Sequence, residues 1–213
     1  MVNLFEDEAL SEADFIKASK ILNRVKSFLG DPSFSKEFWV HLQTRLTPAF
    51  LLGWVFRRVT HFDLRLVFNN QVWATSELPL IPSRITDSLP KLVATDSDEV
   101  VLILNISRNI EDSVTSFVHE WSKQPKAILG YDLNSNQITS AAHALSIALE
   151  ISRKIKNLID RWQVRKIHLF GAMPAALATL IGFHLNAICP ISIYYLDSSR
   201  TQYRLGGTLT NRL

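Results

Sequence analysis

Lys166 to Asn186 reads KIHLFGAMPAALATLIGFHLN, and three signals in this stretch decide the fold. An apolar run that ends at Gly171 is too short for a helix and predicts a β-strand; it contains Ile167, Leu169 and Phe170. Pro174 supplies the fixed φ and the missing N–H that suit the first turn of a helix. Helical spacing then follows at Leu177, Leu180, Ile181, His184 and Leu185. The stretch therefore predicts a strand, a tight turn and a buried helix.

The turn of this βα unit is the first candidate for a binding site. In an open parallel sheet such a turn lies at the carboxyl end of its strand, where the free N–H groups of the following helix favour anions. Ala172 and Met173 would form the floor of the crevice. Every α/β domain contains several such turns, so the rest of the chain has to decide whether this one binds a ligand.

Val100 to Ile106, VVLILNI, predicts a second βα unit of the same design. The run is apolar on both faces, as a central parallel strand must be. Ser107, Arg108 and Asn109 end it, and a helix follows with one apolar face made of Val114, Phe117, Val118 and Trp121. This turn offers a hydroxyl, a guanidinium and an amide at the same edge of the sheet as the first turn.

The alternation of strands and helices predicts an α/β fold with a Rossmann-like, mostly parallel sheet and helices on both faces. A long amphipathic helix is expected from Ala141 to Trp162, and an antiparallel edge strand from Thr201 to Leu205, next to a strand at Ile191 to Leu196. We expect at least four parallel strands, at Leu64 to Phe68, Val100 to Ile106, Lys126 to Tyr131 and Lys166 to Phe170.

The first 46 residues are predicted to form a helical extension, and residues 47–213 the main domain. Ser11 to Leu29 is an amphipathic helix with a capping-box-like start, and Phe34 to Leu46 gives a second helical pattern. Thr47 and Pro48 would open a third, buried helix. A hairpin strand that carries Trp73 is expected next. The connection from Leu78 to Asp98 contains prolines and is either a binding loop or a surface loop with a short helix at Leu89 to Ala94.

Composition narrows the function classes. A chain of 213 residues with 47% apolar content can bury one sizeable core. The 23 basic residues are nearly matched by 20 acidic ones, which makes no case for duplex nucleic acid but leaves a small anionic ligand open. A single cysteine, Cys189, excludes a disulfide framework and fits a reducing compartment. The apolar window Ala49 to Phe56 is too short to span a bilayer, so we expect a cytosolic (cytoplasmic) protein without a membrane partner.

The motifs of common enzymes are missing from the sequence. It contains no G-x-G-x-x-G, no P-loop and no G-x-S-x-G, and no paired cysteine or H-E-x-x-H site predicts a metal. His168 lies within a strand and His184 on a helix face, so both are read as packed imidazoles. We therefore expect no catalytic residues, no metal and no cofactor.

The segment KIHLFGAMPAALATLIGFHLNAICPISIYYLDSSRTQYRLGGTL resembles the C-terminal part of SAVED domains. In that family a strand ending in H-L-F leads to a small residue, a Pro-opened alanine-rich helix and an Ile/Tyr-rich strand with an aromatic hairpin. Leu52-Gly53-Trp54 and the VVLILNIS strand before Arg108 resemble the earlier part of the pattern. The resemblance covers about Thr47 to Leu213.

The resemblance implies a fold related to two CARF-like Rossmann units and a sensor of cyclic oligonucleotides in anti-phage defence, in CBASS or in type III CRISPR systems. SAVED domains are normally fused to an effector such as a nuclease, TIR or protease domain. The 46 residues before Thr47 are too short for any of these. We therefore expect the effector activity on a partner chain or on a missing domain.

A cyclic oligoadenylate needs N–H groups and a guanidinium for its phosphates, amides for base edges, and aromatic or thioether surface for stacking. The residues predicted to bind it are Ser107, Arg108, Asn109, Phe170, Gly171, Ala172, Met173 and Pro174, with Trp73 and Tyr203 as aromatic candidates. Binding should activate an effector by assembly, through head-to-tail self-association or through contact of the helix Ser11 to Leu29 with a separate effector. The alternative is a small Rossmann-like nucleotide-processing enzyme, for which His168 or His184 would be tested first.

Overall fold

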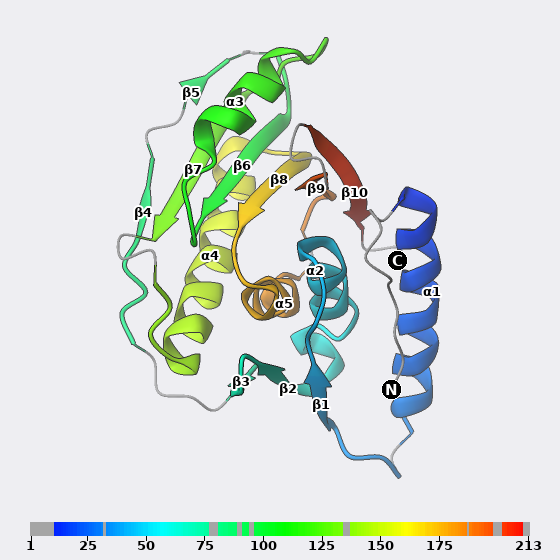
Figure 1. Ribbon diagram of the computed structural model, residues 1–213. Helices are drawn as coiled ribbons and strands as arrows, with labels where there is room; N and C mark the ends of the chain where they lie inside the picture. Colours follow the sequence, from blue (N-terminus) through cyan, green and yellow to red (C-terminus); the bar gives the residue numbers. More distant parts are fainter. Residues whose placement is uncertain are drawn as a thin grey trace.

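Two β-sheets with helices between them make up the fold of the computed structural model (Figure 1). The larger sheet carries α3 on its outer face, and α2, α4 and α5 lie between this sheet and a small sheet of three strands. The structure describes residues 11–31, 33–76, 81–88, 91–93, 96–133, 137–186, 188–197 and 202–210.

The larger sheet confirms the Rossmann-like α/β prediction. Its strand order is β10-β9-β8-β6-β7-β4. Four neighbours run parallel: β6 (Glu99–Asn105), β7 (Ala127–Leu133), β8 (Lys166–Ala172) and β9 (Ile191–Leu196). The antiparallel strands lie outside them, namely β10 (Tyr203–Leu209) on β9, and β4 (Ile85–Asp87) and β5 (Lys91–Leu92) on β7.

Helices cover both faces of this sheet, as predicted. The short helix α3 (Glu111–His119) packs over side chains that point to one face, among them Val101, Ile103 and Phe170. The opposite face, with Val100, Leu102 and Leu169, packs on α4 (Ala141–Trp162) and α5 (Ala175–His184). Burial on both sides explains why β6 and β8 read as nearly continuous apolar runs.

The small sheet corrects two predictions. Its order is β1-β2-β3, with β1 (Glu37–His41) parallel to β2 (Asp63–Phe68) and β3 (Gln71–Ala74) antiparallel to β2. The helix predicted from Phe34 to Leu46 is therefore wrong, because pairing with β2 overrides the helical spacing of its apolar residues. The strand predicted at Leu64 to Phe68 exists as part of β2, but it belongs to the small sheet, and β9 is the fourth parallel strand of the large one.

The first helix, α1 (Glu12–Leu29), docks on its own domain. Its capping box at Ser11 and Asp14 is present as predicted. Its buried side chains, which include Phe15, Ala18 and Leu22, face α2 (Leu46–Val55) and β10. The proposed division of the chain after residue 46 falls in the first turn of α2. A short 3₁₀ turn, η1 (Arg58–Thr60), follows α2.

Helices α2 and α5 touch through their backbones at two glycines. A Cβ atom at Gly53 would lie 2.0 Å from the carbonyl oxygen of Thr179, and one at Gly182 would lie 2.5 Å from the carbonyl oxygen of Phe50. Because α2 also contacts β9 and β10, and α5 contacts β2 and α4, this crossing connects the two sheets.

The connection from Leu78 to Asp98 contains β4 and β5 rather than the alternative short helix; positions 89–90 and 94–95 of that prediction lie outside the described residues. Ser88 and Gly130 exchange hydrogen bonds that hold this connection on β7. Among the described residues, no helix is both long and apolar enough to cross a membrane.

Gly53→Ala should destabilise the fold by about 3 kcal/mol, because the added methyl group meets backbone atoms that cannot rotate away. Denaturant unfolding measures the change. Gly30→Ala is the control: it lies at the C-cap of α1 with φ −68°, and its Cβ would come no nearer than 3.2 Å to another atom, so its effect should stay within about 1 kcal/mol. Equal stability of the two variants would contradict the close crossing.

Candidate functional site

The candidate site lies at the carboxyl ends of β6 and β8, where the strand order reverses. The chain passes from β6 to β7 on one side and then crosses to β8 on the other side. The helices that follow β6 and β8, α3 and α5, therefore leave toward opposite faces of the sheet. Such a switch point is where open α/β sheets hold their ligands.

Hydrogen bonds bring the two predicted turns together at this point. Asn105 and Ala172 are register partners at the ends of β6 and β8. The carbonyl oxygen of Ala172 accepts from the N–H groups of Ile106 and Ser107, at 3.1 and 2.8 Å. The turn after β6 is thereby attached to the turn after β8, and their side chains share one edge of the sheet.

The three polar residues of the turn after β6, Ser107, Arg108 and Asn109, are all exposed. The side chain of Asn109 accepts from the N–H of Glu111 at 2.8 Å, so part of its hydrogen-bonding capacity serves the start of α3. Ser107 and Arg108 remain exposed beside it. Among the ion pairs between described residues, none involves Arg108, which leaves its guanidinium available to an anion.

The N-terminus of α5 faces the same edge without a side-chain cap. Pro174 is the N-cap residue, with φ −62° and ψ 144°, rather than the first helical residue as predicted. The first turn of α5 holds no acidic residue. By contrast, α3 begins with Glu111 and Asp112, which already complement its dipole. The positive end of α5 is therefore the better anion site of the two.

The start of α2 also reaches this edge, which the sequence did not indicate. A methyl carbon of Leu46 lies 3.4 Å from where a Cβ at Gly171 would be, and the methyl of Met173 folds over the same glycine. Like α5, α2 lacks both a side-chain cap and an acidic residue in its first turn. Its N-cap residue is the half-buried Arg45. The hydroxyl of Thr47, in the first turn, is buried and has no hydrogen-bond partner among the residues that the structure describes.

Of the remaining predicted residues, Phe170 and Tyr203 lie near the same end of the large sheet, and Trp73 lies in the small sheet. Phe170 is fully buried and stacks on Tyr194 with 4.6 Å between ring centroids, so its side chain supports the site from beneath. Tyr203 packs against Phe170 and bonds through its hydroxyl to Ser113 on the α3 face. Trp73 is buried in the small sheet against Phe68. The structure thus groups residues 107–109 and 171–174, places Tyr203 at the same edge of the sheet through its pairing with Leu196 at the end of β9, and leaves Trp73 apart.

Asn105 and Asp132 are site residues that sequence reasoning missed. The amide of Asn105 donates to the Asp132 carboxylate at 2.9 Å and accepts from the N–H of Ile110 at 3.0 Å. It is only 2% exposed, so these bonds hold the loop between β6 and α3 from within. An amide that ends an otherwise apolar strand was the available signal.

His168 lies toward the amino end of the sheet, on the α3 face, away from the crevice turns. Its Nε2–H donates to Glu99 at 2.7 Å, and its Nδ1 accepts from the Tyr194 hydroxyl at 3.1 Å. Burial lowers the pKa of His168, and the hydrogen bond to Glu99, which acts to raise this pKa, does not offset the effect of burial. Burial acts to raise the pKa of Glu99, but hydrogen bonds from His168 and Lys123 outweigh it and hold that pKa at about 2. The described contacts fit the prediction of a packed imidazole.

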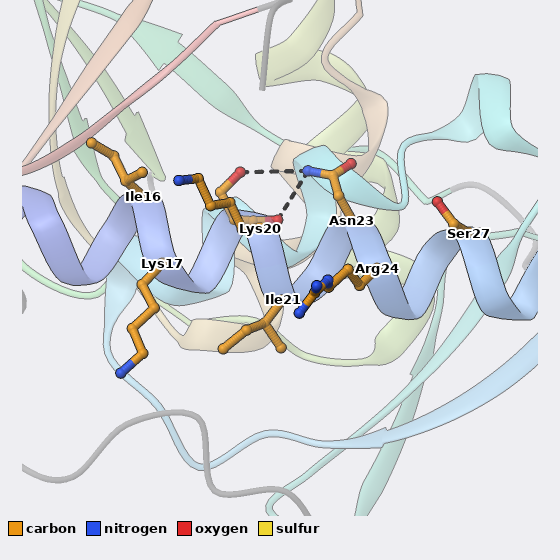
Figure 2. A pocket seen from close by; sticks show the side chains of 8 residues that line it. Ile16, Lys17, Lys20, Ile21, Asn23, Arg24 and Ser27 are labelled. Atoms are coloured by element: carbon orange, nitrogen blue, oxygen red, sulfur yellow. Dashed lines mark hydrogen bonds between the residues drawn. The ribbon is translucent and has the colours of Figure 1, made fainter.

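An open pocket lined by side chains of α1 lies along the outer side of this helix (Figure 2). Lys17, Lys20 and Arg24 line it, and Asn23 bonds back to Ser19 at 3.0 Å. This basic face lies opposite the buried apolar face of α1 and away from the crevice. Among the described residues, no cluster of three or more histidine, cysteine or acidic side chains could hold a metal.

Comparison with known proteins gives one family match. Residues 21–206 match the SAVED family, described as "SMODS-associated and fused to various effectors sensor domain". The chain is 22% identical over 151 residues to CD-NTase-associated protein 4 of Acinetobacter sp. (strain ATCC 27244 / 9458), and 22% identical over 156 residues to the protein of the same name from Moraxella osloensis. Each match covers 70% of this chain but only 32% of the relative.

Solved structures show the same fold. The Acinetobacter baumannii Cap4 SAVED/CARF-domain containing receptor with the cyclic trinucleotide 2'3'3'-cAAA matches with a TM-score of 0.82 at 19% identity, over 93% of this chain and 44% of that one. The Moraxella osloensis Cap4 receptor matches with a TM-score of 0.69 at 19% identity, over 94% of this chain and 43% of that one. The chain thus spans less than half the length of these structures.

Glu99→Gln should make the fold less stable at neutral pH and flatten its response to acid. A carboxylate whose pKa falls from 4.5 to about 2 stabilises the folded state above pH 4.5, and this contribution is lost as the pH falls through about 2. Unfolding free energies across this interval measure it. Glu120→Gln, an exposed glutamate after α3, should keep the wild-type profile. If the unfolding free energy of Glu99→Gln changed with pH as that of the wild type does, the hydrogen bonds of Glu99 with His168 and Lys123 would contribute nothing to stability.

Proposed function

The chain belongs to the SAVED family of sensor domains, and we propose that it binds a cyclic oligoadenylate in the crevice between β6 and β8 and reports it to an effector in anti-phage defence. The Cap4 receptor structures with cyclic trinucleotides support this ligand class. We propose CBASS as the signalling context, because two relatives are named CD-NTase-associated protein 4. Type III CRISPR is the other context that the sequence resemblance implied.

The observation that carries the proposal is the convergence of two uncapped helix starts on the switch point of the sheet. The first turns of α2 and α5 both lack side-chain caps and acidic residues. Their dipoles add positive potential beside the exposed Arg108. A ring of phosphodiesters needs several such donors in one place, whereas a neutral ligand would gain little from them.

The polar and sulfur-containing side chains at this edge fit the bases. Ser107 and Asn109 offer a hydroxyl and an amide for base edges, and Met173 offers a thioether for the face of a purine. Tyr203, at the same edge two strands from β8, stays as a prediction for stacking, whereas Trp73 in the small sheet would need a ligand that reaches beyond the crevice.

We expect thermal-shift assays with cyclic di-, tri- and tetra-adenylates to identify a stabilising ligand. Arg108→Ala should then weaken binding in calorimetry by about 1.5 to 3 kcal/mol, the usual contribution of a charge-assisted hydrogen bond. Arg153→Ala, an exposed arginine on α4, is the matched control and should bind as the wild type does. Unchanged affinity for Arg108→Ala would remove this residue from the site.

The bound ligand should stay chemically intact, because the chain acts as a sensor and the effector activity belongs to a partner chain or to a further domain. His168, which is hydrogen-bonded to Glu99 and Tyr194, lies away from the crevice turns. Mass spectrometry of the ligand after long incubation tests this point. Steady cleavage would favour the alternative, a small nucleotide-processing enzyme, and would direct mutagenesis to His168 and His184.

Signal transfer is proposed to occur by ligand-dependent assembly. A ligand at the rim of a sheet is open on one side, so a second surface that closes over it gains contacts available only to the liganded form. Head-to-tail association would supply that surface. Phe15, Ala18 and Leu22 of α1 are buried in its own domain. A separate effector would instead meet the exposed basic face made of Lys17, Lys20 and Arg24 (Figure 2).

A further inference from the structure

The strand β1 has an edge that no other described strand covers. It pairs only with β2. The ladder is bounded by the bonds Asp63 N–H to Lys36 C=O, at 2.8 Å, and Leu42 N–H to Val67 C=O, at 3.1 Å. Peptide groups alternate along a strand, so even-numbered residues of β1 face β2. The N–H and C=O groups of Glu37, Trp39 and His41 therefore point outward from this edge.

The side chains of these three residues form an exposed row, in which hydrogen bonds hold Glu37 and Trp39. Trp39 is 60% exposed, and its indole N–H donates to Glu37 at 3.2 Å. The other carboxylate oxygen of Glu37 accepts from Arg65 on β2 at 3.2 Å. His41 is exposed at the far end of the strand. A row held in this way loses little conformational entropy when a partner covers it.

An apolar groove of about 320 Å³ lies between α1, α2 and the covered face of β1. Its walls come from α1, with Val25 and Leu29, and from β1, and its floor from α2 and β2. Trp39 points to one face of the sheet and Val40 to the other, yet both line the groove. Apolar surface of α1 and α2 therefore lies beside β1.

We propose that this edge pairs with the same edge of a second copy of the chain, in antiparallel orientation about a two-fold axis at Trp39. In this register Trp39 faces its own symmetry mate, and Glu37 of each copy faces His41 of the other. These are the residues whose peptide groups point outward, so the three residue pairs can exchange six backbone hydrogen bonds. Phe38 and Val40 lie opposite each other on the covered face.

The sequence of β1, EFWVH, is what selects a second copy as the occupant. Antiparallel pairing of a strand with itself requires complementary side chains at positions equally far from the axis, and Glu37 and His41 meet this requirement as a carboxylate acceptor and an imidazole N–H donor. Val25 and the exposed Phe28 would lie beside the joined strands, where the second copy can bury them. The contact closes at two copies and needs no ligand, so it is distinct from the head-to-tail assembly proposed above.

The test uses two single variants of the full chain without ligand. Glu37→Lys places two Lys–His pairs in the interface, and His41→Glu places two Glu–Glu pairs there. Each variant alone should dimerise about tenfold more weakly than the wild type in sedimentation equilibrium. An equimolar mixture should recover affinity as a heterodimer, because the introduced lysine of one copy then faces the introduced glutamate of the other, while the second pair keeps Glu37 opposite His41.

Val72→Lys is the control, since Val72 is a similarly exposed apolar residue on β3, at the opposite edge of the same sheet. It should leave dimerisation unchanged, and circular dichroism should show all variants folded. A wild type that stays monomeric at high micromolar concentration would overturn the proposal. So would a mixture that dimerises no better than its components, which would mean that the copies meet through another surface.

Discussion

The backbone contact between α2 and α5 is the constraint on which the rest of the structure depends. At Gly53 and Gly182 the two helices approach so closely that a single methyl group on either would overlap backbone atoms of the other. One helix packs on β9 and β10, the other on β2 and α4. The small sheet and the large sheet therefore have a fixed relation, because helices in backbone contact have no side chains that could repack between them.

The same contact positions the candidate site. It brings the start of α2 to the carboxyl edge of the large sheet, beside Gly171, where α5 also begins. Two uncapped N-termini then contribute to one potential, while the acidic first turn of α3 keeps the third helix from competing. Electrostatic preference for an anion thus arises from helix placement, with Arg108 adding the one mobile charge of the turns.

Local sequence patterns predicted the strands that are buried on both faces and the helices that have one apolar face. The buried strands β6 and β8, the turns after them and the amphipathic helices α1 and α4 follow from periodicity alone. The prediction of a helix from Phe34 to Leu46 was wrong because the local pattern is ambiguous. The spacing of Phe34, Phe38 and Leu42 fits a helix, and the alternation of Phe38 and Val40 fits a strand. Only the pairing with β2 decides between the two. Likewise the sheet to which β2 belongs, and the arrival of Arg45 at the crevice, depend on contacts distant in sequence.

The stiffness of the crossing limits how a ligand could change the molecule. If α2 slid along α5, other side chains would have to take the places of Gly53 and Gly182 and would collide with the backbone of the facing helix. We therefore expect the two helices to move as one body. A ligand that draws their N-termini toward Arg108 would then displace what rests on α2. That element is α1, which packs on α2 and β10 and whose Phe15 ring fills the space beside Gly207. A movement at the crevice would therefore displace the outer face of α1.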